Sequence, residues 1–512
     1  MSKPVRVRFA PSPTGPLHIG GVRTALFNYL FAKKNGGTFY IRIEDTDQTR
    51  FVPGAEQYIM EALEWLGIAP DETVGKNEKF GPYRQSERKH LYQQYADQLI
   101  ATGNAYYAFD TPEALDTLRK EYESEGKTFI YNHNNREKLD TSLGIDTEET
   151  KRRIANGEDY VIRFKTPVNE TLYLQDIIRG AIKFDTNLLD DKVLFKSDGM
   201  PTYHLANIVD DHLMETSHVI RGEEWLPSLP LHILLYRSFG WDAPEFAHLP
   251  LILKPVGNGK LSKRDGDKMG FPVFPLEWTR AQQGELTEGN TEEGVSSGYR
   301  EKGFFPETVV NFLALLGWND GTDKELYTLN ELIEAFDLSR VHKAGAKFDP
   351  EKNKWFNHQY LIKRSDEDLA KDFIPFLEKK DINISKVDVV RIVSLIKERA
   401  HFVSEFWELS DFFFQAPVSY DEKASKNWNS ATPDLMQKLI SVLENIEDFT
   451  AANIEIVIKD WMTKNEIGMG KVMQPFRLSL VGALKGPHLF DIVEIIGKEE
   501  TISRIHKAID SL

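Results

Sequence analysis

The sequence contains no cysteine. It can therefore form no disulfide and offers no thiolate as a metal ligand or nucleophile, which excludes disulfide-stabilised scaffolds and cysteine-based catalysis. It also contains no run of about eighteen consecutive apolar residues, and no apolar segment typical of an export signal follows Met1. These absences favour a cytoplasmic protein that does not contact a membrane.

Basic residues are fewer than acidic ones, with 63 Lys and Arg against 79 Asp and Glu. The formal net charge is -16 at pH 7, and a partner rich in phosphate would need Lys and Arg. Composition alone therefore argues against a nucleic-acid partner, unless local basic clusters bind it. A hydrophobic content of 41% in 512 residues is typical of a globular protein that exceeds a single core, so several structural units are expected.

The first informative motif covers residues 8–21 and reads R-F-A-P-S-P-T-G-P-L-H-I-G-G. Apolar residues alternate with arginines over residues 5–9, which is the period of a strand, and two prolines followed by Gly15 end that strand. Apolar residues then recur at helical spacing from Val22, which predicts a helix to about Lys34. We expect a strand, a tight turn and a helix.

Such a turn places ligands at the start of a helix. The first helical turn has unpaired backbone N–H groups and the positive end of the helix dipole, and both suit a phosphate. Gly20 and Gly21 allow a ligand close to the backbone, and His18 could donate to a phosphate oxygen. A packed turn histidine is the alternative. A P-loop is excluded, because Gly21 and Val22 occupy the positions of its Lys and Ser/Thr, and G-x-G-x-x-G is absent.

A second cluster, K-L-S-K-R at residues 260–264, follows Gly257 and Gly259. Three cations in five residues usually form a solvated turn. Together, however, H-I-G-G and K-L-S-K-R resemble the two signatures of class I aminoacyl-tRNA synthetases. The segments F-A-P-S-P-T-G, I-R-I-E-D-T-D-Q-T-R and V-I-R-G-E-E-W resemble the glutamyl-tRNA synthetase family in particular, and the resemblance covers nearly the whole chain.

The resemblance implies an α/β fold. Its parts are a doubly wound, Rossmann-type parallel-sheet catalytic domain, an inserted α+β acceptor-stem-binding domain and an all-helical C-terminal anticodon-binding region. Alternating helices and strands in the first hundred residues agree with such a sheet. The expected divisions are 1–106 and 194–262 for the two catalytic halves, 107–193 for the insertion, 263–350 for a stem-contact region with a mobile acidic loop at 272–303, and 351–512 for the helical region. We also expect the catalytic sheet to resume at residues 194–196, and helical periodicity predicts a helix over residues 387–406.

The resemblance also assigns site residues. The expected ATP-binding residues are Pro11, His18, Gly20, Gly21, Glu224, Lys260, Lys263 and Arg264, and the expected catalytic residues are His18, Gly21, Lys260, Ser262 and Lys263. The expected glutamate-binding residues are Arg8, Ala10, Ser12, Glu44, Tyr203, Asn207 and Arg221. Arg8 and Arg221 would bind the side-chain carboxylate, and Glu44 the amino group. Expected tRNA contacts are Lys471, Arg477 and Lys485.

The implied substrates are ATP with Mg²⁺, L-glutamate and tRNA(Glu), used by a monomer. Some members of the family hold a structural zinc through cysteines. In this sequence Ala108, Asp110 and Asn135 fall near those positions, and His133 alone cannot hold the metal. We therefore expect no zinc and no other protein metal site.

Four alternatives stay open at this point. Glutaminyl-tRNA synthetase shares both signatures. A relative that glutamylates a modified tRNA base is normally confined to the catalytic half, so residues 351–512 count against it. A non-catalytic RNA-binding protein that kept the fold would not need both signatures. An unrelated nucleotidyltransferase would share only the two phosphate motifs and would ignore tRNA.

Overall fold

The computed structural model describes residues 4–279, 296–384 and 387–512. The chain divides into two compact units, Met1–Pro350 and Glu351–Leu512, and each is described here by itself. The finer division into five parts stays a prediction. The centre of the expected acidic loop, 280–295, lies outside the described residues.

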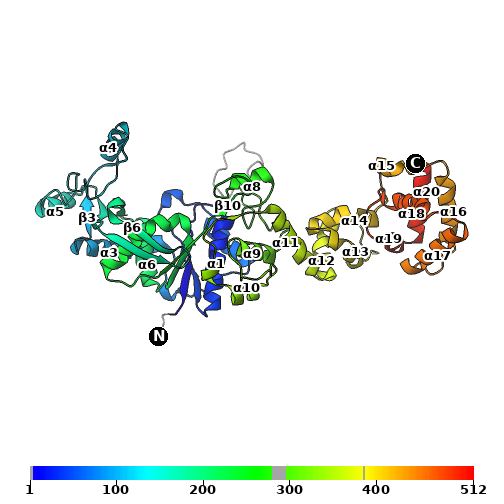
Figure 1. Cartoon of the computed structure of the whole chain (residues 1–512), viewed down its shortest axis with the longest axis horizontal. Coiled ribbons are helices and arrows are strands. Elements are labelled where there is room, and N and C mark those ends of the chain that lie inside the picture. Colours follow the sequence, from blue (N-terminus) through cyan, green and yellow to red (C-terminus); the bar gives the residue numbers. More distant parts are fainter. Residues whose placement is uncertain (1–3, 280–295, 385–386) are drawn as a thin grey trace. The chain divides into compact units, whose positions relative to one another are not determined.

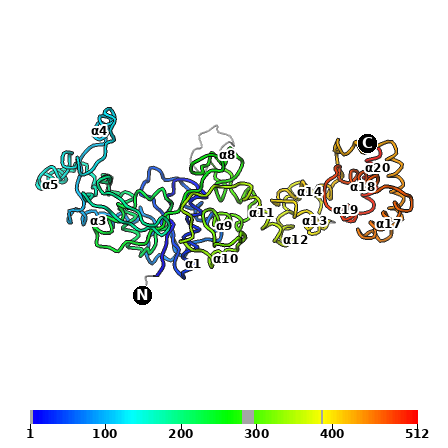
Figure 2. The backbone as a smooth tube through the Cα atoms, in the orientation of Figure 1, coloured from blue at the N-terminus to red at the C-terminus, as the bar shows by residue number. Residues whose placement is uncertain are grey.

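The first unit contains a parallel sheet of four strands in the order β2-β1-β8-β9. These strands are β1 (Arg6–Phe9), β2 (Thr38–Ile41), β8 (His218–Gly222) and β9 (Glu245–Leu249). Figure 2 shows the green backbone of β8 and β9 beside the blue N-terminal backbone, although the insertion separates them in sequence. The sheet is the α/β core that the alternation of elements predicted.

Helices cover both faces of this sheet (Figure 1). Because side chains alternate along a strand, Phe9 faces α1 (Ile19–Lys34), where its ring lies near Gly21, whereas Arg8 faces α6 (Tyr203–Leu213) and bonds to Asp211. The second face also packs against α7 (Leu229–Phe239). The remaining helices of this part are α2 (Ala55–Trp65) and α3 (Lys89–Ala101).

The insertion has its own antiparallel sheet, in the order β3-β4-β7. We expected residues 194–196 to return to the catalytic sheet, and this is wrong. Their strand pairs antiparallel with β4, and Phe195 lies opposite Ile162. Leu194 and Phe195 belong to an apolar cluster that includes residues of both sheets, so their apolar character alone does not choose between the two. The elements of the insertion are β3 (Ala105–Ala108), α4 (Pro112–Ser124), α5 (Thr147–Ala155), β4 (Val161–Phe164), the hairpin β5 (Thr171–Asp176) and β6 (Gly180–Asp185), and β7 (Val193–Phe195).

After β9 the chain forms β10 (Ile252–Leu253), which pairs in parallel with β11 (Ala346–Lys347). Between them lie α8 (Lys263–Met269), α9 (Pro306–Leu315) and α10 (Leu329–Ala335). The described flanks of the expected loop, 272–279 and 296–303, contain buried aromatic side chains. Trp278 is fully buried against Tyr58, whose hydroxyl donates to Leu276 O, and Tyr299 is also buried.

The second unit is helical throughout its described part. We expected one helix over 387–406, and this is wrong. The helix that begins at Val389 ends at Ile396, and a new helix begins at Phe406. Before the new helix, the N–H groups of His401 and Phe402 donate to the carboxylate of Glu405, which caps the turn that leads into it. The helices are α11 (Pro350–Lys363), α12 (Asp366–Glu378), α13 (Val389–Ile396), α14 (Phe406–Phe414), α15 (Glu422–Ser425), α16 (Thr432–Glu444), α17 (Ala451–Lys464), α18 (Met469–Val481), α19 (Leu489–Ile496) and α20 (Lys498–Ser511). Among the described residues, no helix is long and apolar enough to cross a membrane.

Candidate active site

A cavity of about 540 Å³ opens at the carboxyl ends of β1 and β8, beside the first turn of α1. It lies where ligands gather in parallel sheets. Its wall brings together most of the residues that the resemblance assigned: Arg8, Ala10, Ser12, His18, Gly20, Gly21, Glu44, Tyr203, Asn207, Arg221, Glu224 and Lys260. Parts of both signature motifs and of the expected glutamate pocket therefore share one cavity.

Four assigned residues are not on this wall. Pro11 is buried, and Ser262, Lys263 and Arg264 are exposed at the start of α8. Their roles stay predictions.

His18 is the N-cap of α1. Its Nδ1 accepts a hydrogen bond from Gly20 N–H at 3.2 Å. Burial, and then the charge of Lys260, lower the pKa of His18 to about 4, so the ring is neutral at pH 7. Its proton must then reside on Nε2, a buried atom that has no hydrogen-bond partner among the described residues. His18 thus presents a neutral N–H donor to the cavity.

The expectation that the first helical turn offers unpaired N–H groups is wrong for the groups nearest the cavity. Ile19 N–H donates to Val273 O at 2.9 Å, and Gly20 N–H donates to the His18 ring. The N–H groups of Gly21 and Val22 both donate to His18 O. The sequence does not show that the segment around Val273 lies next to the start of α1. The helix dipole and His18 Nε2 remain as the features that suit an anion.

Lys260 forms an ion pair with Glu224, with 2.9 Å between Nζ and Oε1. Both side chains are about half exposed. Burial opposes ionisation of Glu224, but the hydrogen bond from Lys260 lowers its pKa overall. A bound triphosphate would compete with Glu224 for this ammonium group.

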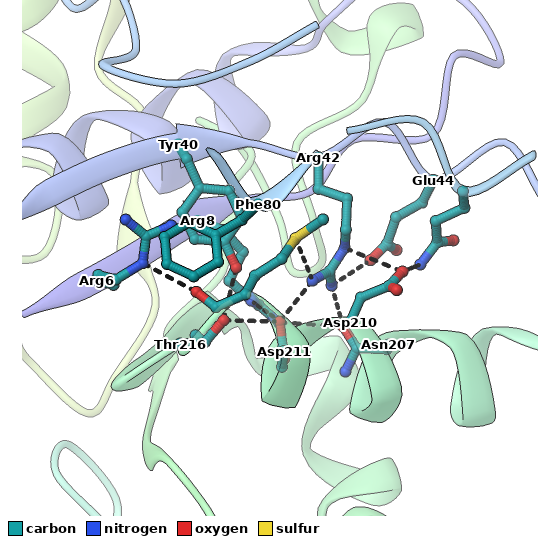
Figure 3. A network of polar contacts seen from close by, with 12 residues as sticks. Arg6, Arg8, Tyr40, Arg42, Glu44, Phe80, Asn207, Asp210, Asp211 and Thr216 are labelled. Carbon is teal, nitrogen blue, oxygen red and sulfur yellow. Dashed lines mark hydrogen bonds and ion pairs between the residues drawn. The ribbon is translucent and has the colours of Figure 1, made fainter. Parts of the chain in front are cut away.

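Arg8 lies in a buried network of charges, drawn in Figure 3. Its Nε and Nη2 donate to the two carboxylate oxygens of Asp211 at 3.0 and 3.2 Å. Arg42 Nη1 donates to the same carboxylate at 2.7 Å. The Nε–Nη2 edge of Arg8 is therefore paired with Asp211, and the expected contact of Arg8 with the side chain of glutamate stays a prediction. Nη1 is the part of Arg8 that remains for a ligand.

The same network orients Asn207. Its Oδ1 accepts from Arg42 Nη2 at 2.8 Å and from Arg8 Nη2 at 3.3 Å. Two guanidinium groups therefore fix which end of the amide is oxygen. Its Nδ2 is a buried donor, and no described residue accepts a hydrogen bond from it. Glu44 accepts from Arg42 Nη2 at 2.9 Å through Oε1 alone, and burial raises its pKa despite this cation.

Arg221 differs from Arg8 in its surroundings. It is 5% exposed, and its recorded hydrogen bonds go to neutral groups. Nη1 contacts Tyr203 Oη at 3.0 Å and His232 Nδ1 at 3.2 Å, and Nε donates to His248 Nε2 at 3.1 Å. Burial, and then the charge of Arg221, hold the pKa of His232 well below its usual range, so that ring is neutral. Within the described part of the chain, no carboxylate lies at hydrogen-bonding distance from this buried cation.

Sequence reasoning missed the residues that support this pocket. Arg42 and Asp211 are almost fully buried, and Asp176, His232 and His248 are buried as well. Such residues can be found in a sequence as charged or polar residues at positions where the period of the strand or helix predicts a side chain that faces the core. That signal identifies a buried polar residue but not its partner.

The residues assigned to tRNA lie on the second unit. Lys471 and Lys485 are exposed. Arg477 is half-buried, and its Nη1 donates to the carbonyl oxygens of Lys485 and Pro487 at 3.1 and 2.8 Å. Arg477 therefore holds the turn that carries Lys485. Their contacts with tRNA stay predictions.

Two of the side chains that fall near the family's zinc-ligand positions form hydrogen bonds with neighbouring residues. Asp110 accepts from Tyr131 Oη at 2.7 Å and from Asp140 N–H at 3.2 Å, while Asn135 Oδ1 accepts from Asn132 N–H. In the described part of the chain, no group of three or more His, Cys, Asp and Glu side chains has the arrangement of a metal site. The absence of zinc in the protein stays a prediction.

Two family profiles match the chain. One, described as tRNA synthetases class I (E and Q), catalytic domain, matches residues 4–276 and 291–355, and the other, described as anticodon binding domain, matches residues 368–509. Two relatives named glutamate–tRNA ligase, from Flavobacterium johnsoniae and Flavobacterium psychrophilum, are 82% and 74% identical to it over 512 residues. Each match covers 100% of both chains.

Solved structures agree with these matches. A crystal structure of a glutamate tRNA ligase from Elizabethkingia meningosepticum in complex with its amino acid is 55% identical in sequence and has a TM-score of 0.95, with 100% of both chains covered. The glutamate–tRNA synthetase of Elizabethkingia anophelis has a TM-score of 0.93. The fold, the cavity and these end-to-end matches show that the chain belongs to the class I tRNA synthetases, in the family of the glutamate–tRNA ligases.

Proposed function

We propose that this chain uses the described cavity to activate L-glutamate with ATP and to transfer it to the 3′ end of tRNA(Glu). The observation that carries the proposal is Arg221, a buried cation without a carboxylate contact in the same cavity as His18 and Lys260. A buried charge is costly unless it is paired, and an acidic substrate would supply the missing anion.

Substrate choice follows from this unpaired charge. The side-chain carboxylate of glutamate would accept from Arg221 and Arg8, and Asn207 Nδ2 is a further donor in reach of the cavity. Glutamine would leave the guanidinium of Arg221 without an anion. Sites built around such groups discriminate by about 10⁴-fold or more against a ligand that leaves them unpaired. Glu44, with Oε2 outside the Arg42 contact, is the proposed acceptor for the substrate amino group.

ATP would bind as its Mg²⁺ complex beside the start of α1. The substrate carboxylate attacks the α-phosphorus, pyrophosphate leaves, and the terminal ribose hydroxyl of tRNA then attacks the carbonyl and releases AMP. Such phosphoryl chemistry depends on positioning and on stabilising negative charge. We assign the charge-stabilising roles to His18 Nε2–H and Lys260, with Ser262, Lys263 and Arg264 joining when the loop closes.

The remaining assignments rest on the family. We propose that tRNA contacts both units, with Lys471 and Lys485 among the contacts on the helical unit, and that the enzyme acts as a cytoplasmic monomer. Sedimentation of the purified protein at several concentrations tests the oligomeric state.

Exchange of labelled pyrophosphate into ATP tests the activity directly. We expect exchange with glutamate and not with glutamine, and a strong dependence on added tRNA(Glu). Charging of purified tRNA(Glu) and tRNA(Gln) then defines the tRNA substrates. Exchange supported equally by glutamine would contradict the role of Arg221, and charging that fails with glutamate and tRNA(Glu) would contradict the proposal as a whole.

A further inference from the structure

Two buried side chains, His248 and Asp176, lie behind Arg221, and neither of them lines the cavity. His248 Nε2 accepts from Arg221 Nε at 3.1 Å, and His248 Nδ1 contacts Asp176 Oδ2 at 2.7 Å. The side chains of His248 and Asp176 are both 0% exposed. The three residues come from β8, β9 and the end of β5, so the insertion hairpin contributes to a chain that ends at the substrate pocket.

The direction of these hydrogen bonds is fixed by chemistry. Arg221 Nε can only donate, so His248 Nε2 must accept. Burial lowers the pKa of His248 even though Asp176 opposes this, so the ring is neutral and its single proton lies on Nδ1. Nδ1–H then donates to Asp176. Neither a protonated ring nor the other tautomer fits, because each would place N–H against the N–H of Arg221.

Both carboxylate oxygens of Asp176 accept hydrogen bonds from backbone N–H groups. Its Oδ1 accepts from the N–H groups of Ile178 and Arg179 at 2.9 and 2.8 Å, and its Oδ2 accepts from His248 N–H at 3.1 Å. Arg179 Nε in turn donates to His248 O at 3.1 Å. The carboxylate is therefore a rigid acceptor that selects one tautomer of His248.

We propose that Asp176 and His248 are positioning residues for glutamate, an inference that rests on the proposed function. Asp176 holds His248 as the Nδ1–H tautomer, and His248 Nε2 holds the Nε edge of Arg221, so that the guanidinium stays turned toward the cavity. Neither residue contacts the substrate. Both act through Arg221.

If Asp176 is neutralised, the change in charge and the change in geometry are expected to have opposite effects on the affinity for glutamate. Removal of a carboxylate near Arg221 would by itself strengthen the attraction of the pocket for an anion. Loss of the tautomer control would instead let His248 turn an N–H toward Arg221 and displace its guanidinium. The sign of the change in glutamate affinity therefore separates a positioning role from a purely electrostatic one.

The first test is Asp176→Asn, with KM for glutamate and KM for ATP measured by pyrophosphate exchange with tRNA(Glu) present. We expect KM for glutamate to rise about tenfold or more, which is the usual scale for losing a hydrogen bond to a charged group, and KM for ATP to change less than about twofold. Asp185→Asn is the matched control. Asp185 lies on β6 of the same hairpin, is exposed and caps Asn187 N–H, so we expect both constants to be unchanged.

A pair of substitutions at His248 separates its two hydrogen bonds. The amide of glutamine reaches the position of Nε2 and can accept from Arg221, whereas the amide of asparagine reaches the position of Nδ1 and can donate only to Asp176. We expect His248→Gln to keep KM for glutamate within about threefold, and His248→Asn to raise it about tenfold or more. In Asp176→Asn/His248→Gln, the second change should restore most of the affinity, because glutamine has no tautomer to select.

The outcomes are distinct. A fall or no change in KM for glutamate in Asp176→Asn would overturn the inference, and so would equal effects of His248→Gln and His248→Asn. If Asp176→Asn does not fold, the His248 pair decides. If the unchanged protein shows no glutamate-dependent exchange, the proposed function fails, whereas normal exchange with no split between the variants overturns only this inference.

Discussion

His18 combines a structural and a chemical task in one ring. Nδ1 caps α1 by accepting from Gly20 N–H, and Nε2–H faces the cavity without a partner. Asparagine is a good N-cap residue whose side chain reaches only the position of Nδ1. The two tasks can therefore be separated at this residue.

We expect His18→Asn to keep the thermal melting temperature within about 2 °C of the unchanged protein, because the cap survives. Pyrophosphate exchange should fall by about 10²- to 10³-fold, the usual cost of removing one donor to developing negative charge. Melting and exchange measured on the same preparation check this. Wild-type exchange in this variant would remove His18 Nε2 from the mechanism.

At Arg221 we expect substitution by alanine to damage the use of glutamate selectively. The change removes a buried cation with no contacting carboxylate, so kcat/KM for glutamate should fall by about 10²-fold or more, while KM for ATP stays near its original value. Arg237→Ala is the control, since Arg237 is half exposed and pairs with Glu170. An unchanged dependence of exchange on glutamate concentration would refute the assignment.

His204 gives a test of pH dependence. Burial, and then the charge of Lys192, lower its pKa to about 4 from the usual value near 6.5. The unfolded chain takes up this proton near pH 6.5 and the folded chain only near pH 4, so folding stability falls as pH falls through this window.

We therefore expect the unchanged protein to lose up to about 2 kcal/mol more stability between pH 7 and pH 5 than His204→Gln does. Urea unfolding at the two pH values measures this. His90→Gln, at an exposed position of α3, should lose as much as the unchanged protein. Equal losses in His204→Gln and the unchanged protein would show that His204 does not titrate as its burial requires.

At the scale of elements, α8 carries the second signature and is only seven residues long. Its position depends on Gly266, where an added Cβ would lie 2.7 Å from Phe271 O and 2.9 Å from Val273 Cγ1. Val273 O also accepts from Ile19 N–H at the start of α1. The two signature elements are thus linked through the segment that follows α8.

We expect Gly266→Ala to force this segment away from α8. The overpacking should cost about 1 to 3 kcal/mol of stability and should also slow exchange, because the start of α1 loses a neighbour. Asp267→Ala, one residue further along the same helix and exposed, is the control and should leave both nearly unchanged. A stable and fully active Gly266→Ala would mean that α8 adjusts without strain.

The elements also show what a sequence can and cannot specify. The apolar period from Val22 predicted α1, and the alternation before Pro11 predicted β1, because both patterns are local. The partner of β7 was not predictable, since three apolar residues fit either sheet equally well. The same limit applies in the pocket: Arg8 was identified, but its pairing with Asp211 depends on a contact between residues far apart in the chain.

At the scale of the whole molecule, Glu351–Leu512 forms a compact unit with its own buried residues, among them Phe373, Ile392, Leu439 and Phe476. A compact unit of this size with its own buried apolar side chains is large enough to fold alone. The division after Pro350 therefore predicts that residues 351–512 fold by themselves.

We expect residues 351–512, produced alone, to give a helical circular dichroism spectrum and one cooperative melting transition. The fragment should show no pyrophosphate exchange, because every residue assigned to the cavity lies before it. A broad, non-cooperative transition would show that the helical unit depends on the rest of the chain.

The short parallel pair of β10 and β11 links the strand before the second signature to the strand before the first helix of the helical unit. β10 leads to the loop of the second signature, and β11 comes directly before the helical unit. Their link consists of main-chain bonds, with Ala346 N–H donating to Leu251 O at 3.2 Å and Phe348 N–H donating to Leu253 O at 2.9 Å. Proline at residue 346 or 348 would delete one of these N–H groups, whereas other side chains there leave the bonds in place. Gly345 is the other sensitive position, because an added Cβ would lie 2.8 Å from Leu253 Cγ and 3.0 Å from Leu251 O.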